Sequence, residues 1–157
     1  MTGIHLKPIG YVKNSIKGGK EDFWRHVQSE IILDSSIYGE ESLQGLQGFS
    51  HIDIIYYFHK NLEDKKPIQH KRRPRGIKSF PELGILAQRA KRRENSLGLT
   101  RCLLLEVRES YLLVEGLDAF DGTPIVDIKP AFKAPEHLNT IVEPDWVTQL
   151  MKDYWKS

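Results

Sequence analysis

FSHIDIIYYFH, residues 49–59, is the stretch that decides the fold. β-Branched and aromatic residues dominate it, and His51 and Asp53 interrupt its apolar run, a composition typical of a β-strand. We expect this strand to lie centrally in a sheet. Its end brings His59 and Lys60 to the rim of a sheet or barrel. His51 fits a hydrogen-bonded strand histidine, whereas His59 fits a site and a surface position equally well.

Further strands are expected before and after this one. Leu6–Lys13 alternates loosely and is entered through Pro8, and Glu30–Asp34 is short and apolar. Cys102–Val107 and Tyr111–Val114 are apolar runs separated by polar residues, which predicts a β-hairpin. The segment from Gly84 also begins as a strand. Six or more strands joined mostly by loops predict a mainly β fold, a small antiparallel β-barrel or strongly curled sheet.

Helices are expected in two places only. Tyr38–Leu46 carries leucines at helical spacing and ends in glycines, which predicts a short helix. Pro144–Trp155 predicts a closing helix, since proline suits its first turn and its apolar side chains share a face. Its aromatic residues fit packing groups or an oligomer interface. Ala131–Asn139 between barrel and helix is expected to be irregular.

Length and composition indicate one soluble domain spanning residues 1–157. The expected strands place its core over about 6–130, and the closing helix is expected over about 144–155. Hydrophobic residues make up 39% and charged residues 28% of the 157. No apolar run approaches the roughly 18 residues of a membrane span, and the start of the chain lacks the apolar core of a signal peptide. Cys102 is alone, which excludes an internal disulfide and a cysteine-built zinc site. A cytoplasmic protein without membrane or metal is therefore expected.

GLDAFDGTPIVDIKP, residues 116–130, concentrates constrained residue types. Asp121-Gly122 followed by Thr123-Pro124 predicts a tight turn, because glycine accepts a positive φ and proline fixes φ before an apolar run. A turn between strands needs only the Asp-Gly pair. The additional carboxylates and the Lys129-Pro130 pair therefore indicate a backbone that meets a ligand.

Basic residues gather in two stretches, although the formal net charge is only +2. Lys60–Lys78 contains Arg73-Pro74-Arg75-Gly76, which proline stiffens, and Gly84–Thr100 adds further arginines. Such arginines suit RNA phosphates or the carboxylate of a small substrate.

Asn14–Glu21 is expected to be a surface loop leading to Phe23 and Trp24, which fit core residues better than a stacking surface. No phosphate-binding P-loop or nucleophile elbow is present, so the residue pattern alone supplies no reaction.

Four segments resemble the TrmO family, also called TsaA-like or YaeB-like proteins. They are Ile9-Gly10, residues 45–59 with Gly48-Phe49-Ser50-His51, the stretch Arg89–Gly98, and residues 116–130. The resemblance implies a small β-barrel that binds S-adenosylmethionine (SAM) as a homodimer. It also implies methylation of N6 of threonylcarbamoyladenosine beside the tRNA anticodon. Residues 87–98 depart from the family pattern by lacking its three prolines and its threonine, although Arg89, Arg93, Asn95 and Gly98 match.

The chemistry of SAM, the positions that match the family and the basic stretches together give the expected site residues. The expected cofactor shell is His59, Lys60, Arg89, Leu99, Leu117, Asp118, Asp121, Gly122, Thr123 and Pro124. The expected acceptor contacts are Arg73, Arg75, Arg93 and Asn95. An amide-like nitrogen becomes more acidic as it is methylated, so a general base assists the reaction. Asp121 is the first candidate for this base, and Lys129 is the residue expected to orient it. Arg93 is expected to contact the acceptor.

Three functions remain open from the sequence. A tRNA methyltransferase is favoured by the arginine-bearing stretches. A small-molecule methyltransferase on the same barrel is favoured by the modest net charge and the altered loop at residues 87–98. A non-catalytic SAM-binding dimer is the third.

Overall fold

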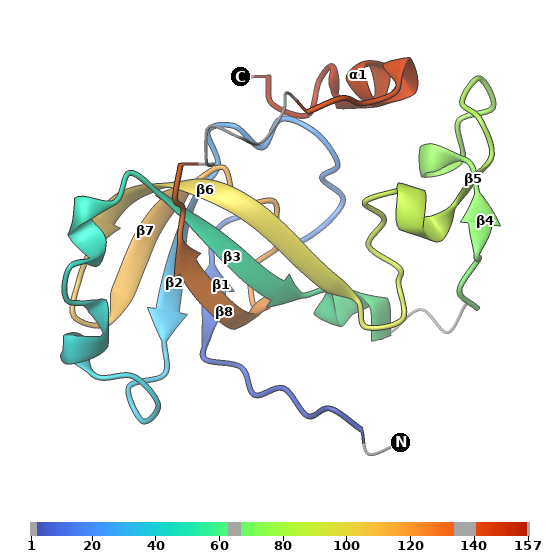
Figure 1. Cartoon of the computed structure of the whole chain (residues 1–157). Coiled ribbons are helices and arrows are strands. Elements are labelled where there is room, and N and C mark those ends of the chain that lie inside the picture. The colour runs from blue at the N-terminus through green and yellow to red at the C-terminus, as the bar shows by residue number, and fades with distance from the viewer. Residues whose placement is uncertain (1–2, 63–66, 134–140, 157) are drawn as a thin grey trace.

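Six antiparallel strands close into a barrel in the order β1-β2-β7-β6-β3-β8. The computed structural model describes residues 3–62, 67–133 and 141–156. The barrel strands are β1 (Gly10–Lys13), β2 (Gln28–Leu33), β3 (His51–Tyr57), β6 (Leu97–Val107), β7 (Tyr111–Glu115) and β8 (Pro124–Pro130). The strand at residues 49–59 is β3, which lies between β6 and β8 and pairs with both. The mainly β barrel expected from the sequence is thus confirmed (Figure 1).

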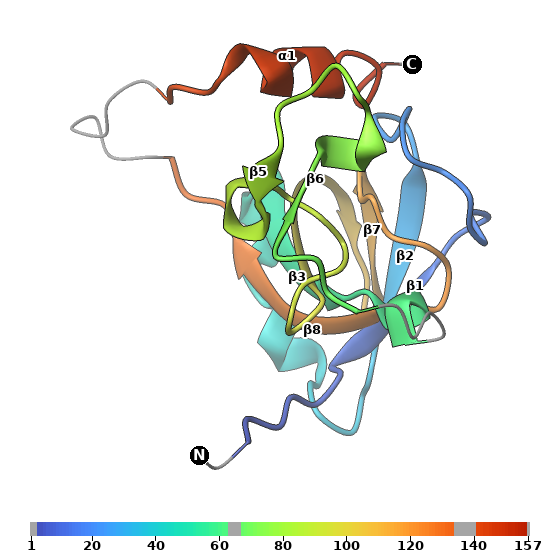
Figure 2. The same ribbon diagram turned by 90° about the vertical axis from the view of Figure 1, so that its right-hand side faces the viewer.

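Smaller elements surround the barrel. β4 (Lys71–Arg72) and β5 (Leu83–Gly84) form a two-stranded sheet, which stands in front of the barrel in Figure 2. The described residues contain five short 3-10 helices, η1 (Glu40–Leu43), η2 (Leu46–Gly48), η3 (His59–Leu62), η4 (Pro74–Gly76) and η5 (Ile85–Ala87), and one α-helix, α1 (Asp145–Met151). In the described part of the chain no helix has the length and apolar character of a membrane span.

Alternate side chains of the strands build the core. Ile52, Ile54 and Tyr56 of β3 are 0%, 0% and 1% exposed, because successive side chains of a strand point to opposite faces. They pack with Ile31 of β2, Leu112 and Val114 of β7 and Ile125 of β8. Burial raises the pKa of the Cys102 thiol, which makes this core cysteine an unreactive apolar group.

β8 contains a β-bulge that changes the direction of its side chains. In the register with β3, Ile54 faces Ile128 and Ile55 faces Asp127, but Tyr56 faces Ile125, so Val126 has no partner. A bulge of this kind inserts one residue and turns the following side chains. Ile125 and Ile128 therefore both contact the core. In a regular strand two residues three positions apart would point to opposite faces.

Several expected elements have different bounds or types. The helix expected over 38–46 is wrong, since η1 and η2 occupy this stretch with the left-handed Gly45 (φ +88) between them. The closing helix covers 145–151 rather than 144–155. The strand expected to begin at Gly84 is wrong, since β5 ends at Gly84 and η5 follows it. The first strand begins at Gly10 rather than Leu6. The irregular segment expected over 131–139 lies mostly outside the described residues.

Two neighbouring aromatic residues differ in burial. Trp24 is 2% exposed and belongs to the core as expected, whereas Phe23 is 50% exposed. The expectation that both fill the core is therefore wrong for Phe23, whose backbone has a φ of +62.

Candidate active site

A small pocket lies at the end of the barrel where β3 finishes and β8 begins. η3 and the residue before it supply one wall, the loop between β7 and β8 supplies another, and the stretch before β6 supplies a lysine. The lining residues are Phe58, His59, Lys60, Lys91, Asp118, Ala119, Phe120 and Thr123. The structure therefore brings together four residues of the expected cofactor shell, His59, Lys60, Asp118 and Thr123.

The Asp118 carboxylate accepts hydrogen bonds from three hydroxyl groups that lie far apart in the sequence. Tyr56 Oη donates to Oδ1 at 2.7 Å, Thr100 Oγ1 donates to the same oxygen, and Tyr154 Oη donates to Oδ2. Burial first, and the neighbouring carboxylate second, raise the pKa of both tyrosine hydroxyls. Both therefore keep their protons at neutral pH and hold the carboxylate in one orientation.

The turn at Asp121-Gly122 has the geometry that the sequence predicts. Thr123 N–H donates to Phe120 O at 3.1 Å, and Gly122 has a φ of +77, as the third residue of a type II turn requires. Val12 N–H donates to Thr123 O at 2.9 Å and Gly122 N–H to Val12 O at 2.8 Å. The turn is therefore fixed to β1.

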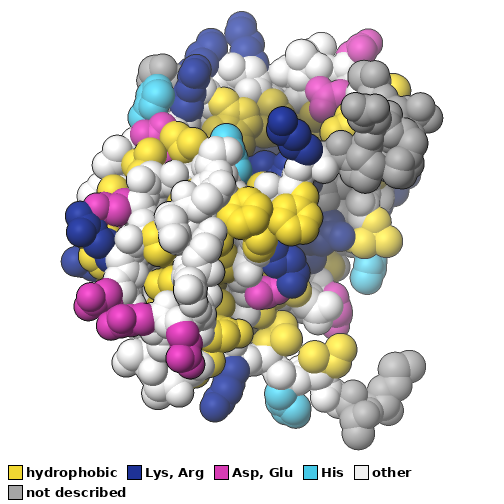
Figure 3. All heavy atoms as spheres, turned by 60° about the vertical axis from the view of Figure 1, so that its left-hand side comes forward, with side chains coloured by type: hydrophobic (Ala, Val, Ile, Leu, Met, Phe, Trp, Pro, Cys, Tyr) yellow, Lys and Arg dark blue, Asp and Glu magenta, His cyan; other side chains and the backbone are white. Residues whose placement is uncertain are grey.

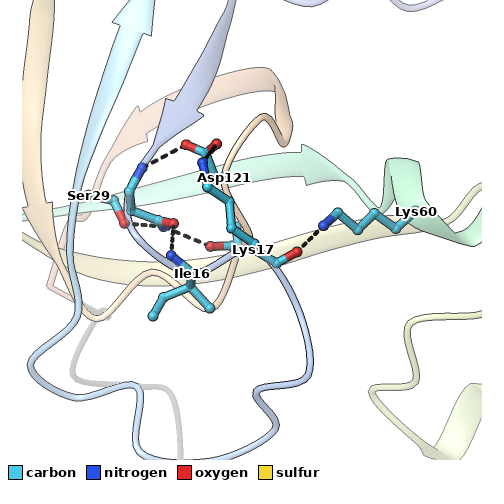
Figure 4. A network of polar contacts seen from close by, with 7 residues as sticks. Ile16, Lys17, Ser29, Lys60 and Asp121 are labelled. Carbon is cyan, nitrogen blue, oxygen red and sulfur yellow. Dashed lines mark hydrogen bonds and ion pairs between the residues drawn. The ribbon is translucent and has the colours of Figure 1, made fainter.

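Asp121 ties the loop after β1 to this turn (Figure 4). Its carboxylate accepts the Asn14 N–H at 3.0 Å and pairs with the Lys17 ammonium, while Lys60 Nζ donates to Lys17 O. Asn14 Nδ2 also donates to Ser29 Oγ at 2.9 Å and to Ala119 O at 3.0 Å. Lys17 first, and then the Asn14 amide, lower the pKa of Asp121, which makes this carboxylate a weaker base.

Two lysines lie over one aromatic ring of the pocket. Lys60 Nζ is 5.2 Å and Lys91 Nζ is 5.4 Å from the centroid of the Phe120 ring, both within the range of cation–π attraction. The ring also lies 6.0 Å from that of Trp24. The pocket thus combines a carboxylate, two ammonium groups and an aromatic ring.

The other residues of the expected cofactor shell are not among the residues that line the pocket. Arg89 donates from Nη2 to Leu99 O at 2.5 Å, so these two residues meet each other. Leu117 is fully buried in the core. Pro124 and Gly122 flank the turn residue Thr123. Lys129 is exposed and forms an ion pair with Asp127 at 2.7 Å, whereas Asp121 pairs with Lys17, so the structure does not join Lys129 to Asp121.

The arginines expected to contact the acceptor bind carbonyl and carboxylate oxygens of this chain instead. Arg93 donates from Nη1 to Ile85 O at 2.9 Å and to Gln88 O at 2.7 Å, and Arg73 donates to Phe80 O. Arg75 binds both oxygens of Asp22 at 2.9 Å. Asn95 is exposed. On the face drawn in Figure 3, the lysine and arginine side chains are scattered rather than gathered in one patch.

Sequence reasoning missed the groups that orient Asp118 and line the pocket. The sequence pattern assigns Tyr56 only to a strand and Tyr154 only to a helix face. The inward register of Tyr56 beside Ile52 and Ile54 was a usable signal. No local signal exists for Tyr154, because its contact with Asp118 joins segments 36 residues apart. Metal ligation has no support in the residues described, which contain no group of three or more His, Cys, Asp or Glu side chains able to hold an ion.

Comparison with known proteins assigns the chain to a family. The model of the tRNA-methyltransferase O N-terminal domain matches residues 19–136. A putative S-adenosylmethionine-dependent methyltransferase, RcsF, of Pseudomonas aeruginosa is 39% identical over 133 residues, which cover 80% of this chain and 53% of that protein. The tRNA (adenine(37)-N6)-methyltransferase of Mus musculus is 32% identical over 145 residues, covering 85% of this chain and 32% of that protein. This chain therefore spans about half the length of the first relative and about a third of the second.

A shorter relative and a solved structure agree with these matches. The probable S-adenosyl-L-methionine-binding protein of Methanothermobacter thermautotrophicus is 33% identical over 132 residues, which cover 83% of this chain and 91% of that protein. The crystal structure of TrmO from Pseudomonas aeruginosa is 26% identical with a TM-score of 0.65, covering 88% of this chain and 61% of that one. The family match over most of the chain, together with the barrel and the pocket at its end, shows that this chain belongs to the TrmO N-terminal domain family.

Proposed function

We propose that this chain is a SAM-dependent methyltransferase that methylates N6 of threonylcarbamoyladenosine in tRNA. The observation that carries the proposal is the pocket, because all of its lining residues fall inside the segment 19–136 that matches the family. Relatives named as SAM-dependent and as tRNA (adenine(37)-N6)-methyltransferases support the donor and the acceptor class.

The groups in the pocket fit the chemistry of SAM. The described hydroxyls fill three of the roughly four acceptor positions of the Asp118 carboxylate, which leaves Oδ2 able to accept a ribose hydroxyl or an amino group. Lys60 and Lys91 suit the methionine carboxylate, and the Phe120 ring suits a cationic or planar group.

The reaction needs position more than it needs a strong base. Bound SAM supplies an electrophilic methyl group, and holding donor and acceptor in line contributes up to roughly 7–11 kcal/mol. The hydroxyls around Asp118 and the ties of Asp121 to Asn14 and Lys17 fix the pocket walls before a ligand arrives. Asp121 as the base and Lys129 as its partner stay predictions, and the lowered pKa of Asp121 favours a tethering role for it.

Labelled-methyl transfer tests the proposal. We expect methyl transfer from SAM into threonylcarbamoylated tRNA and none into tRNA that lacks the modification. Asp118→Asn and Lys60→Gln should weaken SAM binding in calorimetry at least tenfold. Lys13→Gln should leave it unchanged, because Lys13 pairs with Glu30 on the outside of the barrel. SAM binding without transfer to any tRNA would contradict the proposed acceptor.

A non-catalytic SAM-binding protein is the second candidate. The observation in its favour is that this chain covers 91% of a relative named as a probable SAM-binding protein. The transfer experiment separates the two functions, since the binding protein takes up SAM and releases no methyl group. The homodimer, the cytoplasmic location and the single-domain organisation stay predictions, and sedimentation velocity tests the first.

A further inference from the structure

Phe23 presents an aromatic ring to solvent from a strained backbone. Its φ of +62 lies in the left-handed region, which is unfavourable for a bulky residue, and its side chain is 50% exposed beside the buried Trp24. A packing role does not explain an exposed ring, and a turn alone would favour glycine or asparagine at this φ. The ring therefore calls for a functional explanation.

Neighbouring segments hold this conformation from two sides. Phe23 N–H donates to Asp153 O at 3.1 Å and Trp24 N–H donates to Tyr154 O at 2.9 Å. Arg75 binds the Asp22 carboxylate and donates to Glu21 O at 3.1 Å. Figures 1 and 2 both show the loop before β2, in blue, beside the red end of the chain. The surrounding structure thus fixes where the Phe23 ring stands.

A cation and two further rings connect Phe23 to the pocket. Lys20 Nζ lies 6.0 Å from the Phe23 centroid and 5.6 Å from that of Trp24. Trp24 lies 6.0 Å from Phe120, which lines the pocket. An aromatic face with a lysine beside it is the combination that binds unpaired nucleotides, because the base stacks on the ring and the cation attracts the phosphate.

We propose that Phe23 and Lys20 form a stacking platform for an unpaired nucleobase of the RNA substrate, next to the nucleotide that is methylated beside the pocket. The inference rests on the proposed function, since it takes RNA as the acceptor. Charge complementarity favours RNA over an apolar protein partner, because Lys20 lies over the Phe23 ring and Lys60 lies over the Phe120 ring of the adjoining pocket. The left-handed backbone fixes the position of the ring, and stacking on the ring does not depend on which base is bound.

Phe23→Gly tests the platform, because it removes the ring and also relieves the left-handed strain. An anticodon stem-loop RNA carrying 2-aminopurine beside the target adenosine is the probe. We expect its affinity for the full chain to fall between about fivefold and 150-fold, with less quenching of the 2-aminopurine fluorescence. The melting temperature should stay equal or rise. Phe23→Tyr should retain the wild-type affinity, since it keeps the aromatic face.

Tyr38→Ala is the matched control, because Tyr38 is 42% exposed and precedes η1 at the other end of the barrel; it should bind the RNA as the wild type does. Equal affinity and equal quenching in Phe23→Gly and wild type, with methylation intact, would overturn the platform alone. A shift in sedimentation of Phe23→Gly at unchanged RNA affinity would also overturn it, in favour of self-association. If the wild-type chain binds SAM but neither binds nor methylates RNA, the proposed acceptor fails and the platform fails with it.

Discussion

A Cβ atom on Gly98 would lie 2.9 Å from Cε1 of Tyr56, and closer still to two other atoms of the same ring. The two residues face each other across β3 and β6. Only glycine therefore lets the Tyr56 ring lie flat over β6 and carry its hydroxyl to Asp118.

Gly98→Ala should destabilise the fold by about 1–3 kcal/mol, because the added methyl group overpacks the barrel end. The displaced ring should also lose its hydrogen bond to Asp118, so SAM affinity should fall. Urea unfolding and calorimetry measure the two effects. Gly84→Ala is the control, since no atom lies within 4 Å of its Cβ position, and equal stability of the two variants would contradict the clash.

Gly122→Ala should destabilise by about 1–2 kcal/mol through backbone strain alone, because the space around it is open and its φ is +77. Gly122→Asn should destabilise less, since asparagine tolerates the left-handed region. Gly39→Ala, at a φ of −80, should be neutral or slightly stabilising. Urea unfolding ranks the three variants, and a loss in Gly39→Ala as large as that in Gly122→Ala would refute the strain argument.

The buried tyrosines predict alkaline sensitivity. The folded pKa of Tyr56 and of Tyr154 is raised above the unfolded value of about 10, so the unfolded state loses protons first as pH rises. Their contribution is complete below about pH 10 and falls above it, by up to about 1.4 kcal/mol per pH unit for each tyrosine. Tyr56→Phe should flatten this slope in urea unfolding at alkaline pH. An identical slope would mean that Tyr56 ionises freely in the fold, which tyrosinate absorbance can check.

The Asp121 tether predicts an acid transition. The folded pKa of Asp121 is lowered, so its contribution to stability is complete above the unfolded value of about 3.9 and is lost as pH falls through the folded pKa. The amide signal of Asn14, which donates to this carboxylate, should titrate in NMR over that acidic range. In Asp121→Asn the titration should vanish. A titration that persists would assign the effect to another group.

Arg93→Gln should destabilise the chain by about 1–3 kcal/mol, because a charged donor leaves the carbonyls of Ile85 and Gln88. The dependence of RNA affinity on salt should keep its slope, since this guanidinium binds the protein rather than a phosphate. Urea unfolding and RNA titrations at several salt concentrations measure both. A shallower salt dependence in the variant would mean that Arg93 contacts a phosphate of the acceptor RNA.

Local pattern was sufficient for the barrel and for its main turn. The β-branched run at 49–59, the hairpin around residues 108–110 and the Asp121-Gly122 turn were all predictable, because each depends on neighbours in sequence. The helix expected at 38–46 was wrong because the backbone leaves the helical region at Gln44 (ψ 125) and becomes left-handed at Gly45. α1 ends earlier than its apolar pattern, since Tyr154 leaves the helix to reach Asp118.

The site was only partly predictable, for a related reason. Asp118, Thr123, His59 and Lys60 lie close to turns that the sequence shows, and the structure brings them into one pocket. The arginines look the same in sequence whether they face a phosphate or a carbonyl, so pattern alone assigned Arg73, Arg75 and Arg93 to the acceptor. Contacts such as that of Asn14 with Asp121, which are 107 residues apart, depend on the closure of the barrel.

The unpartnered Val126 has a consequence for how this chain tolerates insertions and deletions. A regular strand of the same length would pair Val126 with Tyr56 and turn Ile125 outward to water, because successive residues point to opposite faces. Removing Val126 instead gives an unbroken ladder in which Ile125 still faces Tyr56 and Ile128 still faces Ile54. The barrel core should therefore tolerate a deletion at this position, whereas the present chain length requires the bulge to keep both isoleucines in the interior.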